Sequence, residues 1–526
     1  MKRIPLLSIA TLAACACWLA ACHSPKTRAV TTLSSGASTA AVASGKQSDI
    51  PARPEQLSFP PLEFNPPKPE TYRVPLKSGP VAYVVPDREL PLVNIGIYIH
   101  TGDWVEPEGK EGLTDLCGSL LVSGGTEKRT AQELEERLAF LAAQLGSSIR
   151  GAQGSVSLNL LSKDLDEGMA ILREVLTQPR FQQDRIDLNK QQMLQAMKQR
   201  NDDSENIEGM EAGFLAYGEK FWDNRHQTAA SVESISRDDL LAFHKRWYFP
   251  SNFVLAVSGD FDRDTMTKKL EELFANWPTT GNPPPVIPTN VTMAAPGVYL
   301  VNKDVNQGRV SLMLPGIMRE NPDYFSIIIM NDILGGGGFT SRIVNRVRSD
   351  EGLAYSAYSS FPGGVFFPYA FTAGFQSKSR TVAYATSIVI EEIKRIANVP
   401  VSAEELESAK KGFIDRLPRS FATKAQVASV FAYDEFTGRY ARNPDYWQTV
   451  VPHIKAVTVE NVQQVAKKYL APERLVILVV GQKDEIMQGH PNHPVKLSEF
   501  GKVTDVPLRD PLTLKPLPLG SGAPAK

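Results

Sequence analysis

Histidine side chains are the first candidates for metal or acid–base chemistry in this sequence, and two of them are closely spaced. His490 and His493 lie in the segment QGHPNHP. Two imidazoles can bind one ion, but prolines surround this pair and no third ligand is near in the sequence. A surface loop is therefore favoured over a metal site. The remaining histidines of the chain's main body show no paired spacing: His100, His226, His244 and His453.

Several familiar site motifs are missing from the sequence. It has no glycine-rich phosphate loop, no G-x-S-x-G nucleophile turn and no cysteine set with zinc-ribbon spacing. The 57 basic and 58 acidic residues leave a formal net charge of −1. No nucleic-acid partner is expected, because there is no basic excess to neutralise phosphates.

The N-terminal segment MKRIPLLSIATLAACACWLAAC has the pattern of an export signal, with two basic residues before a short apolar run. Its end, LAAC, resembles a bacterial lipobox, so we expect a signal peptide over residues 1–22 and lipidation of Cys22; an uncleaved anchor is the alternative. Because His23 follows, and not Asp, we expect an outer-membrane lipoprotein that faces the periplasm. Cys117 is the one cysteine left downstream, which excludes an intramolecular disulfide in the mature chain.

Changes in composition divide the rest of the chain. Residues 23–70 are rich in Ser, Ala and Pro and are expected to form a flexible tether. A Pro-rich linker, residues 281–295, separates two long segments, residues 71–280 and 296–497. Residues 498–526 are expected to be a flexible tail.

The two long segments repeat each other. ISRDDLLAFHKRWYFPSNFVLAVSGDF, from Ile235, aligns without a gap with VTVENVQQVAKKYLAPERLVILVVGQK, from Val457. Each copy predicts an N-capped helix, a proline turn and a buried strand that ends at glycine. Because strands and helices follow in mixed order, we predict an α+β fold of two homologous halves, each a largely antiparallel sheet backed by helices.

The segment GGGGFTSRIVNRVRSDEGLAYSAYSSF, Gly335 to Phe361, resembles the second half of the insulinase/pitrilysin zinc peptidases (the inverzincins). In that family, too, a glycine-rich turn, a helix and a GLAY strand follow one another. The resemblance extends over nearly the whole body of the chain. It implies that the two halves are arranged as a clam-shell around a chamber that receives unfolded peptides.

Active members of that family carry H-x-x-E-H on a helix of the first half, where two imidazoles bind zinc and the glutamate acts as the base. Laid over GLTDLCGSLLVSGG, this motif falls on Asp115, Gly118 and Ser119, and a distal glutamate ligand falls near Ala196. Asp115 alone cannot hold the ion, and Gly118 cannot act as a base. The helix keeps its apolar face for packing. We therefore expect no metal or other cofactor bound by this chain.

The resemblance gives Arg348 and Tyr355, in RSDEGLAY, a catalytic role. In the family, this pair projects into the chamber and donates hydrogen bonds to the substrate carbonyl as it gains negative charge. The structural alternative is a helix-end arginine and a core tyrosine. Strand alternation predicts that Tyr355 shares one face with Ala357 and Ser359, while Tyr358 points the other way.

The run before this pair is a candidate substrate-binding segment. It consists of Gly335, Gly336, Gly337, Gly338 and Phe339. Glycines would let a substrate backbone approach closely or would act as a hinge; a helix C-cap is the alternative.

The missing zinc motif and the retained Arg348–Tyr355 pair together resemble the non-zinc subunit of the family's two-subunit bacterial members. We expect a chain that is inactive alone and supplies Arg348 and Tyr355, while a partner, a zinc-binding homologue with H-x-x-E-H, supplies zinc to act on a peptide substrate. The alternative is a catalytically inert lipoprotein that binds peptides or serves as a scaffold. An autonomous peptidase would need metal ligands that the sequence does not offer. The other expected partner is a membrane, bound through the N-terminal lipid.

Overall fold

The computed structural model describes residues 53, 57, 64–277 and 281–519. The chain divides into two units, Met1–Pro61 and Leu62–Lys526, and all of the described helices and strands belong to the second. The expected signal peptide, Cys22 and most of the tether lie outside the described residues. The end of the expected tether is packed, since the Phe64 ring lies 6.0 Å from that of Phe421. Within the described ranges, no helix is long and apolar enough to span a membrane.

The first half is built on a six-stranded sheet with the order β1-β2-β6-β3-β5-β4. The β2–β6 pairing is parallel and the others are antiparallel. The strands are β1 (Arg73–Pro75), β2 (Val81–Pro86), β3 (Leu92–Ile99), β4 (Gln144–Arg150), β5 (Gln153–Leu161) and β6 (Phe253–Gly259). The helices are α1 (Leu113–Ser123), α2 (Ala131–Phe140), α3 (Leu165–Thr177), α4 (Gln183–Lys198), α5 (Ser204–Tyr217), α6 (Ala229–Ser234), α7 (Arg237–Trp247) and α8 (Arg263–Phe274).

The second half has a sheet of the same size, with the order β12-β7-β11-β8-β10-β9. Its β12–β7 and β7–β11 pairings are parallel and the rest are antiparallel. The strands are β7 (Gly297–Asn302), β8 (Gln307–Ile317), β9 (Ala354–Ser360), β10 (Tyr369–Lys378), β11 (Val476–Gly481) and β12 (Val503–Val506). The helices are α9 (Tyr324–Asn331), α10 (Arg342–Val344), α11 (Val382–Asn398), α12 (Ala403–Arg416), α13 (Lys424–Phe436), α14 (Arg439–Arg442), α15 (Tyr446–Ala456), α16 (Val459–Tyr469) and α17 (Lys483–Gln488).

The predicted α+β fold and its repeat are confirmed. The aligned segments form α7 and β6 in the first half and α16 and β11 in the second. Both helices begin with a capping box, in which the side chains of Ser236 and Thr458 accept a hydrogen bond from the backbone of the third helical residue. Both strands are buried along their whole length. Most strand pairings are antiparallel, as predicted.

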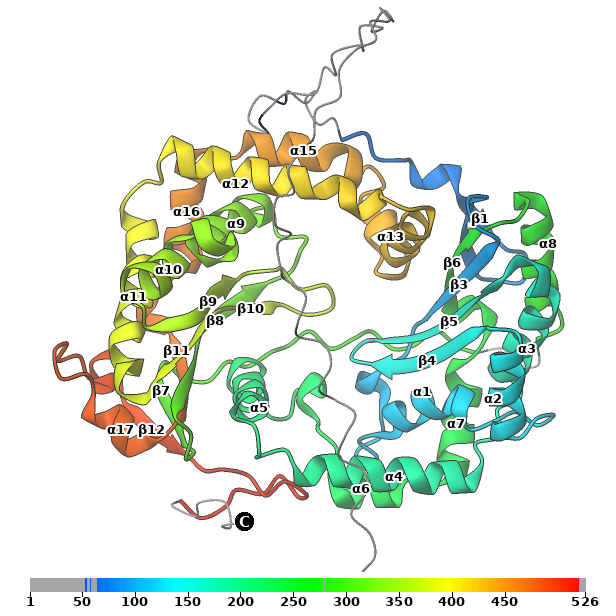
Figure 1. The fold of residues 1–526 in the computed structure, drawn as a ribbon, viewed down its shortest axis with the longest axis horizontal. Helices are drawn as coiled ribbons and strands as arrows, with labels where there is room; N and C mark the ends of the chain where they lie inside the picture. The colour runs from blue at the N-terminus through cyan, green and yellow to red at the C-terminus, as the bar shows by residue number, and fades with distance from the viewer. Residues whose placement is uncertain (1–52, 54–56, 58–63, 278–280, 520–526) are drawn as a thin grey trace, which may run out of the picture. The chain divides into compact units, whose positions relative to one another are not determined.

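The buried strands are apolar on both faces because helices cover both. In β2, Ala82 and Val84 pack with the first half's own helices, whereas Tyr83 and Val85 pack against α13, which comes from the second half. The exchange is reciprocal, since α5 of the first half lies on β8 and β11 of the second (Figure 1). Each half therefore completes the other's core.

Polar contacts fix both exchanged helices. Arg73 of β1 donates two hydrogen bonds of 2.9 Å to the Glu435 carboxylate of α13, and the Tyr83 hydroxyl donates a third at 2.8 Å. On the other sheet, Ser311 of β8 donates through Oγ to Glu208 of α5 at 2.7 Å. These bonds set the position of each helix along the sheet that it covers.

The expectation of a flexible tail from residue 498 is wrong for its described part, residues 498–519. β12 pairs with β7, and the chain then returns to the first half, where the backbone N–H of Ala229 donates to the Leu512 carbonyl at 2.8 Å. Arg509 bonds Glu211 of α5 at 2.7 Å and Glu219 at 2.8 Å. The tail's composition suggested disorder, but these partners are far away in the sequence. The segment forms a strap between the halves (Figure 1).

Arg509→Ala is expected to lower the free energy of unfolding by roughly 3 kcal/mol, because it leaves the buried Glu211 carboxylate without a cation. Urea unfolding measures this change. The matched control is Lys483→Ala, which breaks an exposed ion pair with Asp505 of β12 and should cost less than about 1 kcal/mol. Equal effects of the two substitutions would show that Arg509 does not hold the strap.

Candidate functional site

Phe339, Arg348 and Tyr355 form one exposed stack. The guanidinium carbon of Arg348 lies 4.5 Å from the centre of the Phe339 ring and 4.7 Å from that of Tyr355. Tyr355 is 84% exposed and Phe339 is 65% exposed, so Tyr355 is not a core residue. Arg348 has no hydrogen bond or ion pair to any residue in the described part of the chain. The N–H groups of Arg348 and the Tyr355 hydroxyl are therefore available to a bound molecule.

Arg348 of this stack belongs to a turn that an ion pair ties to α12. α10 continues into a π-helical turn, Asn345–Asp350, that contains Arg348. The preceding Arg342 forms a two-bond ion pair with Glu405 of α12, at 2.7 and 2.9 Å. Hydrogen bonding to Arg342 lowers the pKa of Glu405 to about 2. This pair stays charged at neutral pH and ties the turn to α12.

β9 contains a bulge that re-aims Tyr355. Ala357 pairs with Phe375 of β10, but the next pair along the strands is Ala354 with Ser377. Three steps along β9 therefore match two along β10, so one extra residue is inserted between Ala354 and Ala357. The prediction that Tyr355 shares a face with Ala357 and Ser359 is wrong: those two side chains are buried, while Tyr355 is exposed. The bulge is the physical reason, because strict alternation ends there.

The glycine run mainly serves packing. A Cβ at any residue of Gly335–Gly337 would overlap protein atoms, those of Ser359, Asn331 and Asp332 in turn. These glycines let the π-helical turn Asp332–Gly336 approach β9 closely. Their expected role in substrate binding stays a prediction. Gly338 differs, since it has φ +65° with open space around it, and it directs the chain into the exposed Phe339.

Helix α1 lies too close to strand β4 for a catalytic base. A Cβ on Gly118 would lie 2.8 Å from the carbonyl carbon of Ser148 and still closer to the backbone nitrogen of Ile149. The Ser147 hydroxyl also donates a hydrogen bond to the Gly118 carbonyl. The glutamate that H-x-x-E-H requires at this position would need β4 to move away.

The other two positions of the motif offer no zinc site. Burial raises the pKa of Asp115, and the nearby Asp103 carboxyl raises it further. The Ser119 hydroxyl donates to the Leu116 carbonyl at 3.3 Å and lies 3.4 Å from Oδ1 of Asn189. Among the described residues, no group of three or more His, Cys, Asp or Glu side chains could hold a metal ion. The residues present do not fit zinc.

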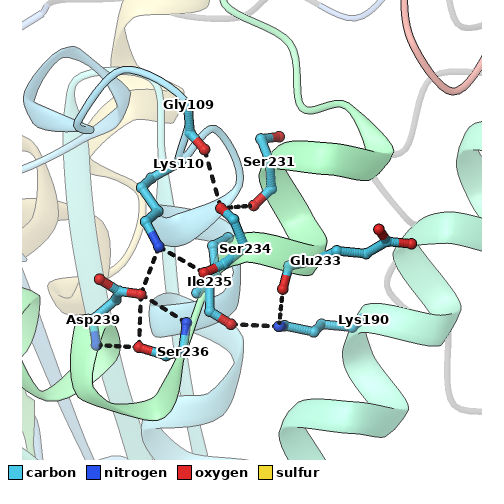
Figure 2. A network of polar contacts seen from close by, with 9 residues as sticks. All are labelled: Gly109, Lys110, Lys190, Ser231, Glu233, Ser234, Ile235, Ser236 and Asp239. Carbon is cyan, nitrogen blue, oxygen red and sulfur yellow. Dashed lines mark hydrogen bonds and ion pairs between the residues drawn. The ribbon is translucent and has the colours of Figure 1, made fainter.

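The scaffold around α1 is intact although the metal ligands are missing. Lys110, in the loop before α1, donates through Nζ to the Ser234 carbonyl at 2.6 Å. Lys190 of α4 donates to the carbonyls of Glu233 and Ile235 (Figure 2). Both lysines thus bind carbonyls at the C-terminal end of α6. The helices that would carry zinc ligands in active members, α1 and α4, are held to the same turn.

A cavity of about 820 Å³ lies beside the degenerate motif. Its lining includes Asp115 of α1, Ala196 of α4 and Thr372 of β10, so both halves contribute to it. Arg348 and Tyr355 do not line it. The structure therefore does not join the Arg348–Tyr355 pair to the degenerate zinc motif in one pocket of this chain.

Sequence reasoning missed Glu106, which caps the start of α1. Its Oε1 accepts hydrogen bonds from the backbone N–H of Gly112 at 3.1 Å and of Thr114 at 2.8 Å, and from the Thr114 hydroxyl at 2.7 Å. Burial raises the pKa of Glu106 to about 7. An acidic side chain near a helix N-terminus was the available signal, but Glu106 lies six residues before Gly112, outside any capping motif.

Comparisons with known proteins agree on one family. The insulinase (peptidase family M16) model matches residues 84–211, and the peptidase M16 inactive domain matches residues 234–413. An uncharacterized zinc protease of Rickettsia bellii is 26% identical over 392 residues, covering 70% of this chain and 89% of the relative. The non-peptidase homolog YmxG of Helicobacter pylori is 24% identical over 405 residues, covering 75% of this chain and 90% of the relative.

The solved structures show the same fold. A peptidase M16 inactive domain from Pseudomonas fluorescens matches with a TM-score of 0.69 at 22% identity, over 78% of this chain and 97% of the other.

Gly118→Ala is expected to lower the free energy of unfolding by roughly 3 kcal/mol, because the new methyl group overlaps the β4 backbone. Thermal and urea unfolding measure this cost. Gly412→Ala in α12 is the matched control. No atom beyond its chain neighbours and the nearby backbone of α12 lies within 4 Å of its Cβ position, so the change should stabilise the protein by about 0.5–1 kcal/mol. If Gly118→Ala leaves the free energy of unfolding unchanged, β4 can move to admit the methyl group. The β4 backbone would then not block a side chain at this position.

Proposed function

Because the chain belongs to the insulinase (peptidase M16) family, as a peptidase-like member of the inactive type, we propose that it is the non-zinc subunit of a heteromeric metallopeptidase. A zinc-binding homologue with H-x-x-E-H supplies the metal and its activated water. This chain supplies Arg348 and Tyr355 to the bound peptide, which the complex degrades or processes.

The exposed stack of Phe339, Arg348 and Tyr355 carries this proposal. An arginine without an ion pair has its N–H donors free for a ligand. The two rings order the guanidinium before binding, so less side-chain entropy is lost when a peptide carbonyl arrives. Donors aimed at a carbonyl oxygen that gains charge contribute roughly 2.7–4 kcal/mol each in comparable sites. These residues suit transition-state stabilisation without any metal in the same chain.

The close packing at Gly118 supports the proposal that the partner supplies zinc while this chain supplies Arg348 and Tyr355. The position of the catalytic base is filled by the backbone of β4, and the ligand positions hold Asp115 and Ser119. The supporting network at Lys110 and Lys190 nevertheless keeps α1 and α4 in place. This chain thus has the fold of a zinc-site half without its chemistry, as expected where a partner holds the metal.

A second candidate is an inert peptide-binding or scaffold protein. It is favoured by the cavity of about 820 Å³, which both halves line and which lacks a metal-binding group. The name of the Helicobacter pylori relative, a non-peptidase homolog, points the same way for that protein. In this case the Arg348 stack would bind a peptide without accelerating its cleavage.

The proposal places the complex in the bacterial cell envelope. Lipid on Cys22 would anchor the chain to the outer membrane, with its folded body in the periplasm. This rests on the sequence pattern of residues 1–22 alone.

Arg348→Ala and Tyr355→Phe are each expected to lower the kcat of the assembled complex by about 10²–10³-fold, because each removes a donor to the developing oxyanion. The complex is purified through a C-terminal tag from gently solubilised membranes, and its subunits are identified by mass spectrometry. Peptide cleavage and size-exclusion profiles are then compared. Arg474→Ala, at an exposed arginine just before β11, is the control and should leave turnover unchanged.

The outcomes separate the two candidates. A stoichiometric homologue with H-x-x-E-H and a selective loss of kcat support the catalytic subunit. Unchanged turnover in an intact complex would falsify the catalytic role and favour the scaffold. A zinc-free monomer without partners would remove the heteromeric proposal altogether.

Cys22→Ser is expected to release the protein from the membrane fraction, because the acylated thiol is lost. Fractionation of cells that produce each form, followed by immunoblotting, measures the distribution. Cys117→Ser is the control for loss of a cysteine, since Cys117 is buried within the first half, and it should stay with the membrane. Retention of the Cys22 variant in membranes would contradict lipid anchoring.

A further inference from the structure

The histidines of QGHPNHP converge in space. Their ring centres lie 4.8 Å apart with a tilt of 48° between the planes. Imidazole nitrogens bind transition-metal ions at about 2.0–2.1 Å, so two rings on one ion have centres on the order of 4–5 Å apart. His490 and His493 are therefore spaced as two ligands of one ion. The sequence alone favoured a plain surface loop, because it could not show this convergence.

A tight turn holds the two side chains together. α17 ends at Gln488 and is capped by Gly489, which has φ +71°. His490 then forms an isolated antiparallel bridge with His493. Pro491 and Asn492 are the two residues between them, and proline at this place has its φ already set for a turn. Residues paired across such a bridge direct their side chains to the same side. The pair is thus ordered before any ligand binds.

An aromatic ring fixes the second imidazole. The His493 ring stacks on Tyr384 of α11, with 3.8 Å between the ring centres and 13° between the planes. A stacked ring uses its face, so the nitrogens on its edge stay free for other contacts. Tyr384 thereby orients His493 and leaves its ligand atoms accessible.

The known contacts of the ring nitrogens are few. Nδ1 of His490 accepts a hydrogen bond from the backbone N–H of Asn492 at 3.2 Å. An ion either replaces this long contact at Nδ1 or binds at Nε2 after the ring changes tautomer. Neither ring forms an ion pair with a carboxylate of the described residues, so no charged partner must be displaced.

We propose that His490 and His493 form a two-histidine site for a divalent transition-metal ion on the surface of the second half. Imidazole ligands suit Cu²⁺, Ni²⁺ and Zn²⁺, and Cu²⁺ binds most tightly in the usual order of affinities. Water completes the coordination, since the described residues offer no third His, Cys, Asp or Glu there. This site is independent of the proposed peptidase role and of the degenerate motif on α1.

The test is a Cu²⁺ titration of the full chain, purified without a polyhistidine tag, followed by calorimetry and electron paramagnetic resonance. His490→Ala and His493→Ala should each weaken binding of one ion by roughly tenfold or more, which is about 1.4 kcal/mol. They should also remove a nitrogen signal from the Cu²⁺ spectrum. Tyr384→Phe keeps the stacked ring and should bind normally, whereas Tyr384→Ala should bind more weakly.

His453→Ala is the matched control. His453 also stacks on an aromatic ring, that of Phe325 at 4.9 Å, but it has no imidazole neighbour in the described structure, so its loss should not change the affinity. The proposal is overturned if Cu²⁺ binds equally well to the double variant His490→Ala/His493→Ala. It is also overturned if the unaltered chain binds no ion in a defined stoichiometry, or if the control weakens binding as much as the pair does. Circular dichroism of every variant verifies that the fold is unchanged.

Discussion

Both faces of the central strands are apolar, and this requirement shapes the rest of the molecule. A strand such as β11, buried along its whole length, needs cover on two sides. Among the described helices, those of each half cover one face of its own sheet. The other face is covered by a helix from the opposite half, α13 on the first sheet and α5 on the second. Neither half can therefore bury its core alone, and the cavity between them is bounded by elements that hold the whole unit together.

Within this shared scaffold, helix α1 has a structural role but lacks the residues for zinc chemistry. The helix with the degenerate motif, α1, is held in place through Lys110, and its start is capped by the buried Glu106. A side chain at Gly118 would meet the β4 backbone, so packing fills the position of the catalytic base. In this chain α1 contributes stability, where active members of the family have catalysis.

The groups that remain available for chemistry share another physical feature. Arg348 lies between two aromatic rings, and His493 lies on a third. A ring face orders a polar side chain without neutralising its charge or occupying its hydrogen-bonding edge. An ion pair would order the same group but consume its donors, as happens to Arg342 with Glu405. Stacking thus keeps Arg348 and His493 both ordered and available.

The sequence by itself determined the duplication, the buried strands, the capped helices at Ser236 and Thr458, and the loss of zinc ligands. These features depend on residue type and local spacing. The tertiary structure alone decided the exchange of α5 and α13, the strap held by Arg509, the bulge before Ala357 and the pairing of His490 with His493. Each of these rests on geometry that a local pattern does not record. Arg509 meets Glu211 across nearly three hundred residues, and the direction of Tyr355 depends on how β10 pairs beside it.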